Sequence, residues 1–235
     1  MTLTEPFLTP EVGAFVDEIS EAAITAFRAF RQTGTTTAWG TVGVYERVPG
    51  QDVLVLISDP GPLKPDDVPS ASVVGLDGTV YRGSSRAGAR RYQRIFEVHP
   101  EITTVVHVHA PHLGAWSQTH RPLPIDYVPV QRFNLVRELP VYVDRTQPEV
   151  EYILEILEKD PDNFAVLEAN GGATVWGRRG LLKTAEEIIL LEEGARIQIL
   201  AQLLGGSQPF GPGVLAQQFA MSQLTERAQR KGLLT

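Results

Sequence analysis

The segment ITTVVHVHA, residues 102–110, constrains the fold more than any other stretch of the chain. Its β-branched residues and its lack of charge predict a buried strand, and alternate residues of a strand point to the same face. His107 and His109 are therefore expected side by side on a rigid support. Two neutral imidazoles in this arrangement can bind one divalent metal ion, although two histidines of a polar core strand would give the same pattern. Both interpretations follow from these residues alone.

The chain has five histidines, and all of them lie close to this strand in the sequence. His112 follows after a proline, where it either approaches the metal or hydrogen-bonds a residue beside it. His99 precedes a proline and His120 precedes an arginine, so these two are predicted to be surface loop residues. The candidate metal ligands are therefore His107, His109 and His112.

The composition argues against several classes of protein. A formal net charge of −7 and a pI near 5.3 do not suit a nucleic-acid or anionic membrane partner. The absence of cysteine excludes disulfides, thiolate zinc sites and cysteine nucleophiles. The N-terminal residues lack the basic start and apolar run of a signal peptide, and no apolar run reaches the roughly 18–20 residues that span a bilayer. We expect a soluble, cytoplasmic protein that acts on a small molecule.

The order of the elements predicts one α/β domain over residues 1–235, with a central, mostly antiparallel or mixed sheet sandwiched by helices. Neither a Gly-x-Gly-x-x-Gly motif nor a Walker-type loop occurs, which disfavours a nucleotide-binding doubly wound fold. Loop structure, with room for a short helical turn, is expected at 59–70. Helices are predicted at 10–31, 87–98, 112–120, 148–160, 181–206 and 212–232; strands or extended segments are predicted at 35–48, 52–58, 71–83, 102–110, 123–133, 139–144 and 163–177.

These segments together resemble the class II aldolase/adducin family. VVHVHAPHLGAWSQTHRPLP is similar to the His-x-His metal strand of the family and to the helix that follows it. TTTAWGTVGVYER resembles the early glycine-rich hairpin, and DPGPLKPDDVPSASVVGLDGTVYRGSS follows the order of the Ser-Gly loop, hairpin and double serine. AVLEANGGATVWG resembles the strand that carries the third metal histidine, and TAEEIILLEEGARIQILAQLLGG resembles the long C-terminal helix.

The resemblance implies a metal-dependent enzyme. In the family, three histidines hold a divalent ion that polarises a carbonyl while a C–C bond breaks, and a nearby carboxylate commonly moves the proton. Members usually form tetramers with active sites at subunit interfaces. For this chain the resemblance implies a lyase that binds zinc, or else manganese or iron, and that assembles as a homotetramer.

The third metal ligand of the family is missing from this chain. Gly171 stands at the position of that histidine and has no side chain to donate. His112 and Glu168 are the candidates to complete the site, but Glu168 lies three residues before Gly171 and is expected on the opposite face of the strand. Glu168 is equally well an interface or surface carboxylate. Asn170 and the glycines after it would open space beside the metal, and Asn170 is a candidate catalytic residue.

The catalytic acid of the family is also missing. Arg86 follows Ser84 and Ser85 at the place where the family typically has a carboxylate. Arg90 and Arg91 add positive charge after it. This charge is either a solvated basic helix face or a site for an anionic substrate, since an arginine fork suits a carboxylate. Arg86 is accordingly a candidate catalytic residue.

The phosphate pocket of the family is altered in this chain. Thr41 replaces an asparagine, Gly43 replaces a serine, and the Ser-Gly loop becomes Pro60-Gly61. Fewer hydroxyl and amide donors predict a small oxygenated or carboxylated substrate without a phosphate. The candidate substrate-binding residues are Thr41, Gly61, Ser84 and Ser85.

Two further groups of residues have predicted structural roles. Trp39, Trp116 and Trp176 are expected in core or interface packing rather than as platforms for a substrate. Arg132 and Arg137 are expected to be an exposed basic pair at an oligomer contact or a pocket wall.

Three functions are compatible with these residues. The first is a lyase of the class II aldolase fold that cleaves a C–C bond or decarboxylates its substrate. The second is a ferrous-iron oxygenase on the same fold. The third is a non-catalytic interaction module, as in adducin head domains; loss of the third ligand favours it, and retention of all three clustered histidines opposes it.

Overall fold

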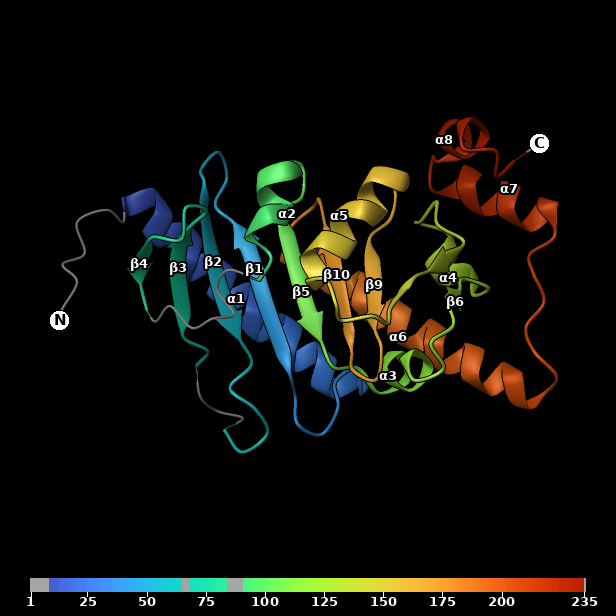
Figure 1. The fold of residues 1–235 in the computed structure, drawn as a ribbon, viewed down its shortest axis with the longest axis horizontal. Coiled ribbons are helices and arrows are strands. Elements are labelled where there is room, and N and C mark those ends of the chain that lie inside the picture. The colour runs from blue at the N-terminus through green and yellow to red at the C-terminus, as the bar shows by residue number, and fades with distance from the viewer. Residues whose placement is uncertain (1–8, 65–67, 84–90, 235) are drawn as a thin grey trace. The chain divides into compact units, whose positions relative to one another are not determined.

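The computed structural model describes residues 9–64, 68–83 and 91–234 (Figure 1). The fold is mixed α/β, with a central sheet flanked by helices, which confirms the predicted class. The chain divides into two compact units, residues 1–109 with 174–186 and residues 110–173 with 187–235. Among the residues that the structure describes, no helix combines the length and the apolar character needed to cross a bilayer.

The first unit is built on a sheet in the order β4-β3-β2-β1-β5-β10. Four successive antiparallel pairs link its first five strands. Val42 and Val44 of β1 and Val55 of β2 are buried, and both strands contact helix α1, which lies behind them in Figure 1. The strands are β1 (Val42–Arg47), β2 (Val53–Ser58), β3 (Ala71–Gly75), β4 (Val80–Arg82), β5 (Thr104–Val108) and β10 (Ala173–Gly177).

Helix α1 (Pro10–Thr33) has clear sequence punctuation at both ends. Thr9 accepts a hydrogen bond from the backbone N–H of Val12, and Pro10 occupies the first turn, where its missing N–H costs nothing. Gly34 ends the helix in the left-handed conformation at φ 69°. Both ends are close to the predicted ones because capping is a local property of the sequence.

Helix α2 (Gln93–Val98) begins later than predicted, because residues 91 and 92 are not helical. Tyr92 has φ −119° and ψ 7°, and its side chain is fully buried, with the ring edge-on to Tyr45 at 5.1 Å between centroids. The helix therefore starts after this core residue. The earlier part of the predicted helix, residues 87–90, lies outside the described residues.

The second unit holds the parallel pair β8 (Val141–Tyr142) and β9 (Ala165–Glu168) and the antiparallel pair β6 (Leu123–Pro124) and β7 (Glu138–Leu139). The extended structure predicted for 123–133 is wrong in part, since Val128–Gln131 form the helical turn α4; its proline lies in the first turn, where proline is tolerated. The longer helices are α3 (Pro111–Ser117), α5 (Glu149–Lys159), α7 (Pro212–Met221) and α8 (Thr225–Arg230).

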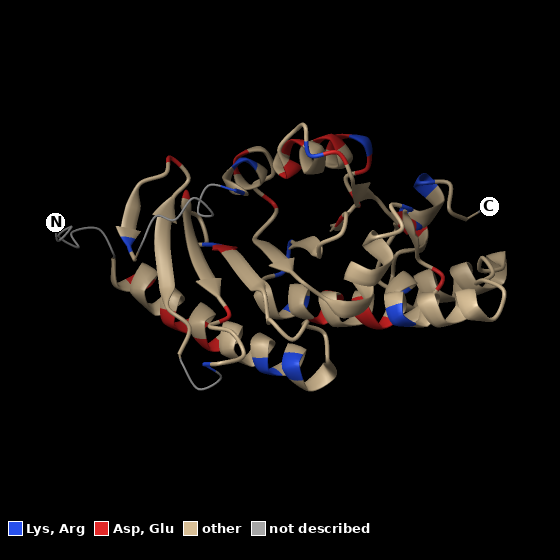
Figure 2. Ribbon diagram, turned by 60° about the horizontal axis from the view of Figure 1, so that its bottom comes forward, with Lys and Arg blue, Asp and Glu red and all other residues tan. Residues whose placement is uncertain are grey.

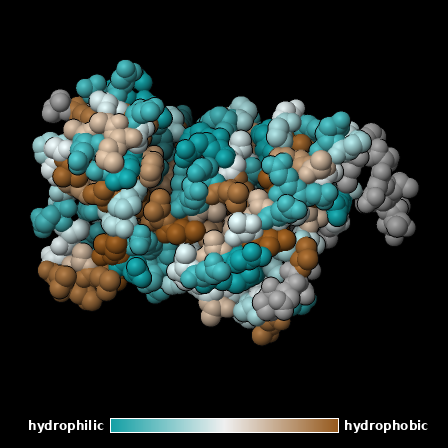
Figure 3. All heavy atoms as spheres, turned by 180° about the vertical axis from the view of Figure 1, so that it is seen from behind, coloured by the Kyte–Doolittle hydropathy of each residue, from teal (hydrophilic) through white to brown (hydrophobic). Residues whose placement is uncertain are grey.

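Two helices show how charge and apolar surface are distributed. Acidic residues follow α5 in Figure 2, and two of them, Glu149 and Glu151, lie in its first turn. Helix α6 (Leu181–Leu203) begins in the first unit and continues in the second. Leu200 and Leu203 near its end and Leu204 directly after it are exposed. Figure 3 shows a cluster of hydrophobic atoms at the lower left of the face that it draws.

Candidate functional site

The buried strand β5 holds the histidine pair as predicted. The ring centroids of His107 and His109 lie 5.2 Å apart, and the rings are inclined by 72°. His107 is only 8 % exposed, and His109 is half-buried. Gly43 of β1 pairs with His107 in the ladder, and a Cβ atom at Gly43 would meet no atom within 4 Å. The glycine that replaces the family serine therefore leaves open space beside the first histidine.

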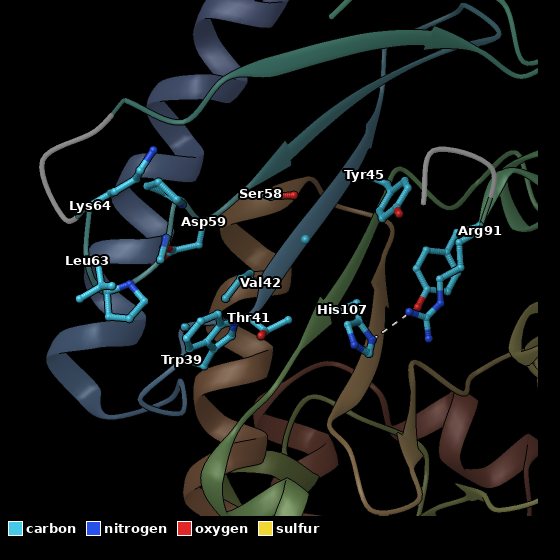
Figure 4. Close-up of a pocket in the computed structure, with 16 residues that line it drawn as sticks. Trp39, Thr41, Val42, Tyr45, Ser58, Asp59, Leu63, Lys64, Arg91 and His107 are labelled. Carbon is cyan, nitrogen blue, oxygen red and sulfur yellow. Dashed lines mark hydrogen bonds between the residues drawn. The ribbon is translucent and has the colours of Figure 1, made fainter. Parts of the chain in front are cut away.

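A buried hydroxyl pair fixes the orientation of His107. Its Nδ1 lies 3.1 Å from Thr174 Oγ1 and 3.5 Å from the Tyr92 hydroxyl, and the two hydroxyls lie 3.0 Å apart. The dashed line at His107 in Figure 4 marks its contact with the Tyr92 hydroxyl. A ring whose Nδ1 faces such a partner binds a metal through Nε2, and the partner sets the tautomer. Sequence reasoning missed Tyr92 and Thr174, since neither lies near His107 in the sequence nor belongs to a recognisable spacing.

In the second unit, Glu168 stands next to the position of the missing histidine. Strand β9 ends at Glu168, and a turn closes after it through the Gly171 N–H, which donates to the Glu168 carbonyl oxygen at 2.9 Å. A Cβ atom at Gly171 would lie 3.0 Å from Glu168 Oε2. The carboxylate therefore borders the space that a side chain at residue 171 would enter. The expectation that Glu168 faces away was wrong, because strand alternation stops at Glu168 and does not reach the turn.

The carboxylate of Glu168 is largely shielded from solvent. The residue is 8 % exposed, and its Oε1 lies 3.3 Å from the guanidinium of Arg145. Burial of a carboxylate is costly unless a cation is near, so this position suits a positively charged neighbour. Arg145 is itself well exposed.

The turn after β9 also positions Asn170. This residue has φ 57°, and its Oδ1 lies 2.9 Å from Nε2 of His120, which has φ 56°. His120 is exposed, as expected of a surface loop residue, yet it holds the amide of Asn170. The catalytic role predicted for Asn170 stays a prediction.

His112 has a carboxylate partner of its own within the second unit. Its Nδ1 lies 2.6 Å from Glu192 Oε1, and the carboxylate of Glu192 also accepts the backbone N–H groups of His112 and Leu113 at 2.8 and 2.9 Å. Glu192 thus caps the first turn of α3. Burial raises the pKa of Glu192, and the bonds from His112 and Leu113 oppose that shift. Metal binding by His112 stays a prediction.

The first unit also contains a cavity of about 500 Å³ that includes His107 (Figure 4). Two of the predicted substrate-binding residues, Thr41 and Gly61, line it, and so does Arg91. Asp59 lines it as well, with Oδ2 2.6 Å from Arg31 and Oδ1 accepting the N–H of Gly61 at 2.7 Å. The predicted residues Ser84, Ser85, Arg86 and Arg90 lie outside the described residues.

The comparisons with known proteins agree with this architecture. A family profile described as "Class II Aldolase and Adducin N-terminal domain" matches residues 21–199. The chain belongs to this family. No curated protein matches the chain.

Solved structures of class II aldolases share the fold. An L-fuculose 1-phosphate aldolase superposes with a TM-score of 0.70 at 15 % identity, covering 90 % of this chain and 96 % of the other. The L-fuculose 1-phosphate aldolase from Glaciozyma antarctica PI12 gives 0.68 at 19 %, covering 98 % and 97 %. The enzyme of the same name from Thermus thermophilus gives 0.64 at 21 %, covering 81 % and 100 %. At these identities the likeness establishes the fold and leaves the substrate open.

Among the three tryptophans of this family member, Trp116 and Trp176 are buried as predicted. Trp39 does not pack in the core, because this residue is 74 % exposed and lines the cavity, while the interface role predicted as the alternative stays a prediction. The segment before β1 bends around Gly40, at φ 70°, and Trp39 directly precedes that bend. A glycine turn next to a tryptophan allows the side chain to point away from the core. Sequence composition alone does not show this orientation.

The basic pair Arg132 and Arg137 is not exposed in the way we expected. Both residues are half-buried, and Arg132 Nε donates to Gln218 Oε1 at 2.8 Å. Arg137 lies 3.4 Å from Asp126, and its guanidinium sits 5.0 Å from the ring centroid of Phe210. These contacts give the pair a structural role inside the second unit.

Proposed function

We propose that this class II aldolase family member is a metal-dependent lyase. It would cleave a C–C bond, or remove a carboxylate, in a small oxygenated or carboxylated substrate that carries no phosphate. The observation that carries the proposal is the His107–His109 pair on β5, in which Nδ1 of His107 is held 3.1 Å from Thr174 Oγ1. Such a pair is oriented to bind a cation through the opposite ring nitrogen of His107.

Glu168 is the third ligand in this proposal, in place of the family histidine. The support is its carboxylate, which lies 3.0 Å from the position of a Cβ atom at Gly171. Two imidazole nitrogens and one carboxylate oxygen form a donor set that fits catalytic zinc, and we propose zinc with manganese or iron as alternatives. When bound, the divalent ion would act as a Lewis acid that stabilises negative charge on a substrate oxygen while the bond breaks.

The remaining residues would bind and orient the substrate. We propose that Arg86 pairs with a substrate carboxylate through its guanidinium fork and that Ser84, Ser85 and Thr41 donate hydrogen bonds. The turn at Asn170, with glycines after it, would leave room for the substrate to approach the ligands. In this scheme His112 has a supporting role, because Glu192 already engages its Nδ1.

One observation favours a second function. A carboxylate at the third position makes a two-histidine, one-carboxylate set, which is also the ligand set of non-haem ferrous oxygenases. The identity of the bound metal separates the two enzymes, with iron pointing to the oxygenase and zinc or manganese to the lyase. A chain that binds no metal would instead be a non-catalytic interaction module.

Elemental analysis of protein purified without a histidine tag tests the proposal. We expect about one divalent ion per chain, lost in His107→Ala/His109→Ala and strongly reduced in Glu168→Gln. His99→Ala is the matched control, because His99 is a partly exposed histidine paired with Glu101. Absence of metal in the wild-type protein, even after addition of zinc, manganese and ferrous iron, would overturn both enzyme functions. A native mass measurement of the same sample tests the homotetramer that we propose from the family.

A further inference from the structure

Two loops form one end of the cavity in the first unit, and large apolar side chains line the cavity there. Trp39 comes from the segment before β1, and Leu63 comes from the segment after β2. These side chains are 74 % and 90 % exposed, and Pro60 and Pro62 line the cavity beside them. Figure 4 places Trp39 and Leu63 on one side of the cavity and His107 and Arg91 on the other. Large apolar groups exposed around a concave site indicate an apolar ligand group.

Two glycine N–H groups of these loops, of the kind that can bind a phosphate, already have partners inside the protein. Gly40 and Gly61 have φ values of 70° and 94°, which is the backbone conformation of anion-binding nests. The N–H of Gly40 donates to the Thr37 carbonyl oxygen at 2.8 Å, and the N–H of Gly61 donates to Asp59 Oδ1 at 2.7 Å. Both donors are therefore used inside the protein.

Asp59 opposes a phosphate in a second way. Its carboxylate lines the cavity with a side-chain exposure of 2 %, and Arg31 offsets its charge from 2.6 Å. A phosphate dianion beside this carboxylate would face like-charge repulsion, which Arg31 and Lys64, a further residue that lines the cavity, would reduce. An uncharged ligand group at this end of the cavity meets no such penalty.

We propose that this cavity binds the aromatic side group of a carboxylic-acid substrate, with the ring against Trp39 and the acid end toward His107 and Arg91. The assignment of the acid end rests on the proposed function; the assignment of the aromatic end rests on the cavity alone. The Arg91 guanidinium lies 5.2 Å from the centroid of the Tyr92 ring, and the hydroxyl of Tyr92 contacts His107. A cation therefore lies beside the tyrosine that touches this histidine. A volume of about 500 Å³ is ample for a phenyl-bearing acid of this kind.

Three 2-hydroxy acids that differ only in the group on C3 test the proposal. They are lactate, 3-phenyllactate and 3-phosphoglycerate, titrated into the full chain by calorimetry. We expect 3-phenyllactate to bind at least about tenfold more tightly than lactate, since burial of a phenyl ring supplies that much. We expect 3-phosphoglycerate to bind no better than lactate.

Variants of the cavity wall locate the ring. Trp39→Ala should weaken 3-phenyllactate by about tenfold and leave lactate unchanged, whereas Trp39→Phe keeps an aromatic face and should stay within about threefold of wild type. Leu182→Ala, an exposed apolar residue of the same unit that does not line the cavity, is the control and should change nothing. The fluorescence of Trp39, obtained as the difference between wild type and Trp39→Phe, should respond to 3-phenyllactate alone.

Two results would overturn the proposal. One is tighter binding of 3-phosphoglycerate than of 3-phenyllactate. The other is a Trp39 fluorescence that neither acrylamide nor 3-phenyllactate alters, which would mean that other protein covers this side chain. The His107→Ala/His109→Ala variant separates the two proposals. This variant should lose the metal and bind both acids more weakly. If it still binds 3-phenyllactate more tightly than lactate, the aromatic site stands without the metal.

Discussion

Replacement of Thr174 by valine should weaken metal binding while the fold stays intact. The two side chains have nearly the same shape, so the change removes the Oγ1 atom that lies 3.1 Å from His107 Nδ1 and 3.0 Å from the Tyr92 hydroxyl. Without that partner the His107 ring loses its fixed tautomer and orientation. Loss of such a contact typically costs about 10–100-fold in metal affinity, which corresponds to roughly 1.4–2.7 kcal/mol.

Competition against a chromophoric zinc chelator measures this loss without any assay of activity. Thr174→Ser is the matched control, because it keeps the hydroxyl and should remain within about threefold of wild type. Tyr92→Phe should also have a small effect, since its 3.5 Å contact with His107 is long for a hydrogen bond. Thermal unfolding should show that Thr174→Val costs only about 1 kcal/mol, the usual value of one hydrogen bond. Equal zinc affinity of Thr174→Val and wild type would refute the role of Thr174 and the binding of metal through Nε2 of His107.

The remaining predictions concern stability and the third ligand. Burial raises the pKa of Glu46 to about 8. Since this is above its ordinary value, the free energy of unfolding should fall by roughly 2–5 kcal/mol as the pH rises from about 5 to 8.5. Glu46→Gln should flatten that pH dependence in urea titrations. Gly177→Ala should destabilise by about 1–3 kcal/mol, because its Cβ would lie 2.0 Å from a hydroxyl oxygen of α6. Gly13→Ala, where nothing lies within 4 Å, should instead stabilise α1 by about 0.5–1 kcal/mol in the same thermal scans. Gly171→His alone should bind zinc no better than wild type, whereas Glu168→Ala/Gly171→His should bind zinc through three histidines. Tighter zinc binding by Gly171→His than by the double variant would show that residue 171 and the Glu168 carboxylate do not compete for one space.

Local patterns predicted the fold well because each element has its own signal in the sequence. Thr9, Pro10 and Gly34 punctuate α1, and the alternating valines of β1 and β2 mark a half-buried antiparallel sheet. The predictions failed where tertiary contacts decide the backbone. The fully buried Tyr92 lies outside the helix that was predicted to include it, and Val128–Gln131 form the turn α4 within a segment that looked extended, since proline is tolerated in a first turn.

The candidate site was only partly predictable for a related reason. His107 and His109 are two residues apart, so strand geometry alone brings their rings together. Thr174 and Tyr92 reach His107 only through the pairing of distant segments, and no spacing in the sequence shows that contact. Strand alternation gave the wrong side for Glu168 relative to Gly171. Strand β9 ends at Glu168, so alternation does not apply to the turn that contains Gly171.

The absence of the third histidine and the presence of Glu168 are physically linked. A Cβ atom at residue 171 would approach the Glu168 carboxylate to 3.0 Å at Oε2, 3.3 Å at Cδ and 3.4 Å at Cγ. Contacts this short require the Glu168 carboxylate to shift by a few tenths of an ångström, so a side chain at residue 171 and the carboxylate in its observed position compete for the same space. Glycine at 171 therefore does more than delete a ligand, since it leaves open the space next to the turn that this buried carboxylate borders. In the proposed metal site the Glu168 carboxylate therefore takes the place of the imidazole that the family has at residue 171.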